Sequence, residues 1–154
     1  MEKLWTEYKH THPLILLDIP IGLPHREIPV RQCETEARKL LAGGRRSSVF
    51  SPPCREAANA ASYEEACRIN LEIIGRKISI QTWGIVPKIR EVDEFLRCHP
   101  ETLTFLRESH PEVSFWALNG QKPALHYKKS EEGFQERLTV LKCIIPDAEA
   151  VVHS

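Results

Sequence analysis

The sequence predicts an α/β fold with a large helical content. Residues 14–18 read Leu-Ile-Leu-Leu-Asp, a short apolar run typical of a buried strand, and the breakers Pro20, Gly22 and Pro24 follow it. Longer stretches elsewhere carry apolar residues at helical spacing. In open α/β sheets ligands bind at the carboxyl ends of the strands, so Asp18 is a candidate site residue. The alternative is that Asp18 only caps the turn after the strand.

The composition limits the class of protein. The chain has 154 residues, the size of one domain, and its 21 Lys and Arg balance 21 Asp and Glu. A net charge of zero argues against a protein that mainly coats nucleic acid. The five cysteines are odd in number and include no C-x-x-C pair, which fits neither a disulfide framework nor a zinc site. We therefore expect reduced thiols and a cytoplasmic location and, because no apolar run approaches ~20 residues, no membrane partner.

The N-terminal third is predicted to hold two helices around the strand. Residues 1–12 favour a short helix, because two of their large apolar residues lie four apart. After the strand, Pro29 opens a helix that is predicted to end at the glycine pair 43–44. Its polar face carries Glu34 and Arg38 four residues apart, and the simplest interpretation of this spacing is a surface ion pair.

The next segment, residues 45–53, shows no helical period. Arg45 and Arg46 stand beside two serines. Guanidinium groups match phosphate oxygens, so this segment is either an anion-binding loop or an ordinary solvated loop. Residues 62–75 are the best-marked helix, with a capping box at the start and a glycine at the end.

Residues 77–98 form a second helical region, which we expect to break at Pro87 because a proline ring clashes with the preceding turn. Beyond the break, apolar residues at helical spacing predict one buried face: Ile89, Val92, Phe95 and Leu96. Residues 103–108 are the second predicted strand, ending at Glu108, although a helix is the alternative there.

The C-terminal part is predicted to be helical with polar connections. Pro111 opens a short helix, and residues 121–130 form a polar connection. The last helix begins at Ser130, where two acidic residues suit the helix dipole. Residues 146–154 are predicted to be a flexible tail of a single domain that spans residues 1–154.

Acidic residues end both predicted strands, and this pattern suggests a metal site. Asp18 and Glu108 would meet at one edge of the sheet, with His110 and Glu112 just beyond. Grouped carboxylates suit Mg²⁺, and two such ions can clamp the attacking and leaving oxygens of a phosphodiester. Cationic side chains elsewhere are candidates for phosphate contacts: Arg45, Arg46, Lys88, Lys128, Lys129 and Arg137.

A series of short motifs occurs in order along most of the chain. They are D-I-P-I-G-L-P at 18–24, S-S-V-F at 47–50, S-I-Q-T-W at 79–83, P-K-I-R-E-V-D at 87–93, H-P-E-V-S-F at 110–115 and L-N-G at 118–120. Single residues in the same order add to the pattern: Arg31, Glu36, Ala37, Arg38, Pro53, Arg55, Glu108, Lys128, Lys129, Gly133 and Arg137. This series resembles a bacterial family of unknown function whose members are described as predicted ribonuclease-H-like nucleases.

The resemblance implies a ribonuclease-H-like core with a bound divalent metal, Mg²⁺ or Mn²⁺. Asp18 and Glu108 would be the metal ligands on neighbouring strands, and His110 and Glu112 would position water or supply a third ligand. That fold begins with three antiparallel strands, the first of which carries an essential acid. Here the thirteen residues before Leu14 show no strand pattern, so we expect a family member that lacks its N-terminal hairpin.

Two functions from different classes follow from this pattern. The first is a metal-dependent nuclease that hydrolyses nucleic-acid phosphodiesters, with activity lowered or lost through the missing strand. The alternative is a non-enzymatic binding or assembly domain. A sheet edge left open by the missing hairpin is a template for another strand, so we expect self-association through that edge.

Overall fold

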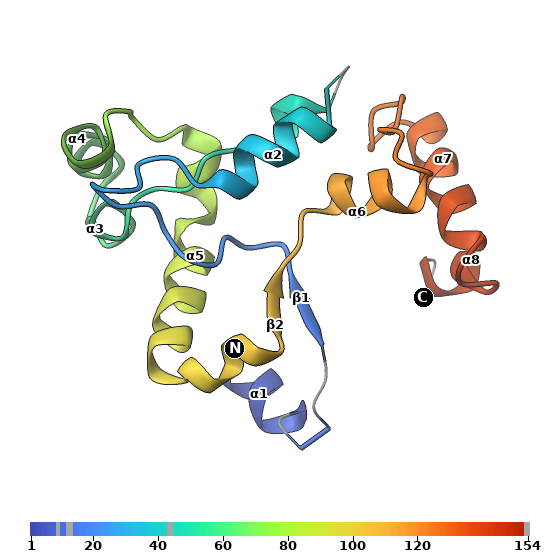
Figure 1. The fold of residues 1–154 in the computed structure, drawn as a ribbon, viewed down its shortest axis with the longest axis horizontal. Helices are drawn as coiled ribbons and strands as arrows, with labels where there is room; N and C mark the ends of the chain where they lie inside the picture. Colours follow the sequence, from blue (N-terminus) through green and yellow to red (C-terminus); the bar gives the residue numbers. More distant parts are fainter. Residues whose placement is uncertain (9, 12–13, 43–44, 153–154) are drawn as a thin grey trace. The chain divides into compact units, whose positions relative to one another are not determined.

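The computed structural model describes residues 1–8, 10–11, 14–42 and 45–152 (Figure 1). Within these ranges the chain is mostly helical, 57%, and has one parallel sheet of two strands. The predicted α/β fold with a ribonuclease-H-like core is therefore wrong. The physical reason is that the two strands have only three residues each, whereas most other apolar residues recur at helical spacing and pack as helices.

The elements follow one another along the chain as short helices with the two strands far apart in sequence. In order they are α1 (Glu2–Tyr8), β1 (Ile15–Leu17), α2 (Gln32–Leu40), the 3₁₀ turn η1 (Arg46–Ser48), α3 (Arg55–Ala58), α4 (Tyr63–Ile74), α5 (Ile80–Cys98), the 3₁₀ turn η2 (Pro100–Thr104), β2 (Leu106–Glu108), α6 (Pro111–Leu118), α7 (Glu131–Lys142) and α8 (Ala148–Val152). The predicted helix end at residues 43–44 lies outside the described residues. The stretch 146–154, predicted as a tail, contains α8, and its flexibility stays a prediction.

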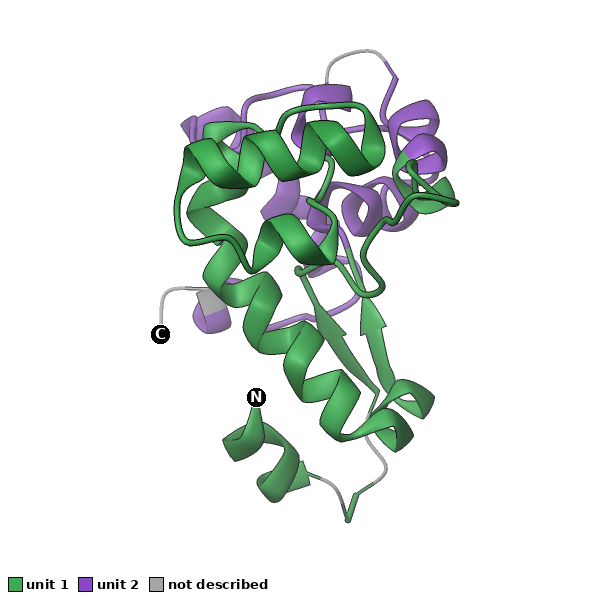
Figure 2. Cartoon of the chain, turned by 90° about the vertical axis from the view of Figure 1, so that its left-hand side faces the viewer, with its two compact units in different colours: residues 1–34, 50–109 green, residues 35–49, 110–154 purple. Residues whose placement is uncertain are grey.

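The chain divides into two compact units, which Figure 2 shows in different colours. The first unit comprises Met1–Glu34 and Phe50–Ser109 and contains the sheet. The second comprises Thr35–Val49 and His110–Ser154 and contains α6, α7 and α8. None of the described helices has both the length and the apolar character that crossing a membrane requires.

The sheet of the first unit pairs β1 with β2 in parallel. Ile15 is the register partner of Leu106, and Leu17 is the partner of Glu108. One face of the sheet packs on α5, where Ile15, Leu17 and Leu106 join the core cluster of Val92, Phe95 and Leu96. Because side chains alternate along a strand, Leu16 is directed to the opposite face, and it is 58% exposed.

The predicted signals of α4 are confirmed. The Ser62 hydroxyl accepts a hydrogen bond from the amide of Glu65 at 3.2 Å, and the Glu65 carboxylate accepts from the amide of Ala61 at 2.9 Å. The helix ends at Gly75, whose φ of 77° lies in the left-handed region that glycine adopts without strain. Local side-chain chemistry therefore sets both ends of this helix.

Helix α5 runs without interruption through Pro87, so the predicted break is wrong. The helix is anchored on both sides of the proline. Val86 and Ile89 pack with Leu23 and Ala58, and the predicted buried face from Ile89 to Leu96 is confirmed. An internal proline costs about 3 kcal/mol, and each buried large apolar side chain contributes about 1.5–3 kcal/mol, so the packing of several such residues outweighs one proline.

Candidate functional site

The parallel register places Asp18 and Glu108 at the same end of the sheet, as the sequence predicts. Glu108 is the last residue of β2, and Asp18 follows Leu17 directly. Leu17 and Glu108 are register partners, and Asp18 is the first residue after β1. The register confirms that the two residues lie at the same end of the sheet, and the convergence of their carboxylates stays a prediction.

Arg31 lies beside Glu108, one of the two predicted metal ligands. One guanidinium nitrogen, Nη2, donates to Oε2 of Glu108 and, at 3.2 Å, to the carbonyl of Ile21. The other, Nη1, lies 3.0 Å from Oε1 of Glu34. The amide of Ile21 also donates to Oε2 of Glu108 at 2.9 Å. One buried arginine thus links two carboxylates to the loop that follows β1.

The electrostatics of this cluster keep Arg31 charged. Burial of its guanidinium acts to lower its pKa, but the hydrogen bond and charge of Glu108, with the charge of Glu34, outweigh burial and raise the pKa of Arg31 above its ordinary value. The side chains of Arg31 and Glu34 are only 9% and 5% exposed. The carboxylate pair therefore has a permanent, buried counter-charge.

A second buried ion pair holds the predicted residue Glu112. Both of its carboxylate oxygens accept from Nη2 of Arg137, at 2.7 and 2.8 Å. Nη1 of the same arginine donates to the carbonyl of Gly133 at 2.9 Å, and its guanidinium lies over the ring of Phe115. These contacts link α6 to α7. Glu112 is predicted to position water or to supply a third metal ligand, and Arg137 is predicted to contact phosphate. In the structure the charges of the two side chains neutralise each other.

His110, predicted to position water, caps the start of α6 and contacts the segment of η1. Its Nε2 lies 3.2 Å from the carbonyl oxygen of Ser48, an acceptor, so Nε2 carries the proton in this contact. Nδ1 is buried and has no hydrogen-bond partner within the described ranges. The ring therefore ties α6 to the arginine-rich segment of the second unit.

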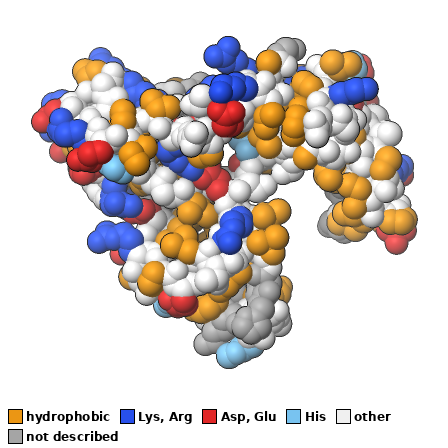
Figure 3. Space-filling view, viewed as in Figure 1, with side chains coloured by type: hydrophobic (Ala, Val, Ile, Leu, Met, Phe, Trp, Pro, Cys, Tyr) orange, Lys and Arg blue, Asp and Glu red, His pale blue; other side chains and the backbone are white. Residues whose placement is uncertain are grey.

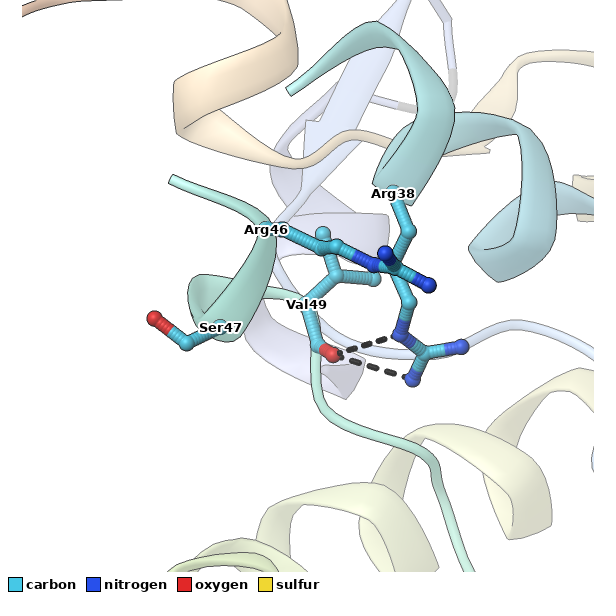
Figure 4. Close-up of a pocket in the computed structure, with 4 residues that line it drawn as sticks. All are labelled: Arg38, Arg46, Ser47 and Val49. Carbon is cyan, nitrogen blue, oxygen red and sulfur yellow. Dashed lines mark hydrogen bonds between the residues drawn. The ribbon is translucent and has the colours of Figure 1, made fainter. Parts of the chain in front are cut away.

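Arg45 is used differently from its neighbour Arg46. Its Nε and Nη2 donate to the carbonyls of Ala124 and Leu125, at 3.1 and 2.8 Å. Arg46 is exposed and, with Arg38, Ser47 and Val49, lines a pocket of about 560 Å³ (Figure 4). Arg38 donates from Nε and Nη2 to the carbonyl of Val49, at 3.2 and 2.9 Å. Thus Arg45 anchors the segment, and Arg46 faces solvent.

The three lysines predicted to contact phosphate are exposed. Lys88 lies on α5 in the first unit, and Lys128 and Lys129 lie before α7 in the second. Each unit therefore carries part of the predicted cation set.

The carboxylates present do not fit the divalent metal that the sequence resemblance implies. Mg²⁺ and Mn²⁺ need oxygen ligands that converge. Glu108 accepts from Arg31 and from an amide, and both oxygens of Glu112 accept from Arg137. In the part of the chain that the structure describes, no three His, Cys, Asp or Glu side chains form a group that could hold a metal.

Sequence reasoning missed Arg31 and Glu34 as members of this cluster. The prediction that Glu34 lies on the surface is wrong, because its side chain is buried beside Arg31, and the predicted pairing with Arg38 stays a prediction. A signal was available, because Arg31 and Glu34 are three residues apart and so can meet on one helical turn. Spacing alone does not decide between the two arginines, since each lies within one turn of Glu34.

Of the comparisons with known proteins, the one with family models gives a match. A family model described as protein of unknown function (DUF429) matches residues 1–154. No curated protein and no solved structure matches the chain.

Proposed function

The chain belongs to the DUF429 family of proteins of unknown function, and on this premise we propose that it is a non-enzymatic assembly domain that pairs with a second copy through β1. The observation that carries the proposal is that, in the part of the chain that the structure describes, β1 pairs with β2 alone and leaves its other edge open. Leu14, just before β1, is 68% exposed, and Leu16, on β1, is 58% exposed. Figure 3 shows hydrophobic side chains exposed in the region of the strands.

Backbone geometry identifies which groups the open edge offers. Ile15 N donates to Phe105 O at 2.9 Å, and Leu17 O accepts from Ser109 N at 2.8 Å. In a parallel ladder alternate residues bond to the same neighbour, so Ile15 and Leu17 face β2. The amide and carbonyl of Leu16 therefore point away from β2, toward the open edge.

A second copy suits this edge because the edge is complementary to itself. In an antiparallel pair centred on Leu16, the two Leu16 residues would exchange N–H···O bonds across a twofold axis. Their exposed side chains would lie side by side on one face, which removes apolar surface from water. The net charge of the chain is zero, so long-range repulsion does not oppose the association.

The test is light scattering on the full chain over a range of concentrations. We expect the average mass to rise from monomer toward dimer for the parent and to stay monomeric for Leu16→Lys, since lysine on an edge disfavours pairing. Leu71→Lys is the matched control, because Leu71 is an exposed leucine on α4, away from the strand edge. A monomeric parent at every concentration, or a Leu16→Lys variant that associates like the parent, would refute the proposal.

The competing function is a metal-dependent nuclease, as the description of the resembling family suggests. Its support is that Asp18 and Glu108 end neighbouring strands at the same edge. Against it stand the arginine contacts of Glu108 and Glu112. The test is a nuclease assay on single strands, duplexes and RNA–DNA hybrids in Mg²⁺ or Mn²⁺. We expect no cleavage that depends on Asp18, so Asp18→Asn should give the same result as the parent. Cleavage that Asp18→Asn abolishes would favour the nuclease.

A further inference from the structure

Basic residues gather in one short stretch of a chain that is neutral overall. Residues 37–50 contain Arg38, Lys39, Arg45 and Arg46 and no Asp or Glu. This stretch runs from the middle of α2 through η1, within the second unit except for its last residue. Local positive charge in an otherwise balanced chain is typical of an anion contact.

Two of these cations border the pocket of the second unit. Arg38 comes from α2 and Arg46 from η1, and none of the described lining residues is acidic. The Val49 carbonyl accepts two hydrogen bonds from Arg38 and so fixes the plane of its guanidinium. Figure 4 shows the guanidinium groups of Arg38 and Arg46 turned to the same side, with the Ser47 hydroxyl pointing away from them.

The segment that carries Arg46 is held in place by its neighbours. Arg45 bonds to two carbonyls of the 124–125 backbone, and the ring of His110 bonds to the carbonyl of Ser48. Arg46 itself is exposed, and among the described residues its guanidinium has no hydrogen-bond partner. A positioned backbone with an available guanidinium lowers the ordering cost of binding a ligand.

We propose that the pocket lined by Arg38 and Arg46 binds a phosphate group. Guanidinium groups are planar and present N–H donors in a fork that matches phosphate oxygens. Arg46 presents this fork to solvent, and Arg38 adds a second positive charge to the lining of the same pocket. The charged side chains among the described lining residues are both arginines, which favours an anion over a cation as the ligand. The pocket belongs to the second unit and β1 to the first, and the two proposals are tested by different variants and measurements.

The experiment measures binding by the parent chain of two probes, inorganic phosphate and a short single-stranded oligonucleotide, at constant ionic strength set with chloride. Constant ionic strength separates binding from screening. Chemical shifts of the backbone amides of residues 46–49 report occupation of the pocket. We expect Arg46→Gln to weaken binding about tenfold to a hundredfold, the range for losing a hydrogen bond to a charged group.

Arg68→Gln is the matched control, because Arg68 is an exposed arginine on α4, outside the pocket. It should bind both probes like the parent. Arg46-dependent binding of inorganic phosphate supports a small phosphorylated ligand, and Arg46-dependent binding of the oligonucleotide alone supports the same site with a nucleic-acid phosphate. No binding of either probe, or equal weakening by Arg46→Gln and Arg68→Gln, would overturn the proposal.

Discussion

At the scale of single residues, Arg31 is a buried cation shared by two carboxylates. Its contacts with Glu34 and Glu108 join the start of α2 to the end of β2. Removing one partner of a buried ion pair is costly, because the other charge stays buried without compensation. The stability of the sheet end therefore depends on the arginine more than on any single carboxylate.

We expect Arg31→Met to lower the free energy of unfolding by about 3–5 kcal/mol, as measured by urea denaturation. Combining it with Glu34→Leu should recover much of the loss, since the buried charge is then removed as well. Arg68→Met is the control with an exposed ion pair. Because the Arg68–Glu72 pair is exposed, its loss should lower the free energy of unfolding by less than about 0.5 kcal/mol. An Arg31→Met protein as stable as the parent would contradict the role of this ion pair.

Gly133 is required by the close approach of the 127–128 backbone to α7. A Cβ added there would lie 1.9 Å from the carbonyl oxygen of Tyr127. Gly133→Ala should destabilise the chain by about 1–3 kcal/mol, the usual range for overpacking. Gly84→Ala is the control, because Gly84 lies within α5 with no atom within 4 Å of an added Cβ. Thermal melting should show Gly84→Ala stabilised and Gly133→Ala destabilised; the opposite order would contradict this packing.

At the scale of elements, a carboxylate of α7 organises the connection before the helix. Glu136 accepts from the amides of Leu125 and His126, at 2.8 and 3.0 Å. Burial acts to raise the pKa of Glu136, but these hydrogen bonds and the neighbouring His126 ring outweigh burial and lower it. The folded chain therefore releases this proton more readily than the unfolded chain does.

The sign of the pH dependence follows from this depressed pKa. Glu136 contributes fully to the free energy of unfolding above its pKa in the unfolded chain, about 4.3. This contribution is lost as the pH falls through the lower pKa that Glu136 has in the folded chain. The stability difference between the parent and Glu136→Gln should therefore shrink as the pH drops below about 4.3. Exposed Glu94 supplies the control variant Glu94→Gln, which should change stability little. A difference that is constant over this pH range would rule out the linkage.

Elements with local signals could be predicted from the sequence, and those decided by distant contacts could not. The ends of α4 depend on Ser62, Glu65 and Gly75, which lie within or next to the helix. Pro87 is a local signal that was overruled, because the helix packs on both sides of it. The predicted α/β class is wrong because the two apolar runs form strands of only three residues each, whereas most of the other described residues are helical.

The candidate site shows the same division. Asp18 and Glu108 could be placed at one end of the sheet because each follows a short apolar run. The partner of Glu108 could not be found in this way, since Arg31 is 77 residues away in the chain. Glu112 and Arg137, 25 residues apart, were both singled out, but their spacing carries no sign that they pair with each other.

At the scale of the whole molecule, we propose that the chain completes its sheet with a second copy. Within the described ranges the sheet has two short strands, and isolated strand pairs are marginally stable unless other strands or helices cover them. Helix α5 covers one face. Pairing at the β1 edge would extend the sheet to four strands in a closed dimer.

Amide hydrogen exchange at β1 tests this claim most directly. The Leu16 amide points away from β2, so it should exchange rapidly in dilute solution and become protected as the concentration rises. The amides of Leu17 and Ser109 lie in the β1–β2 ladder, so dimerisation adds no hydrogen bond to them and their protection should change less. Rapid exchange of the Leu16 amide at every concentration would contradict the claim. Equal protection of this amide in dilute and in concentrated solution would contradict it as well.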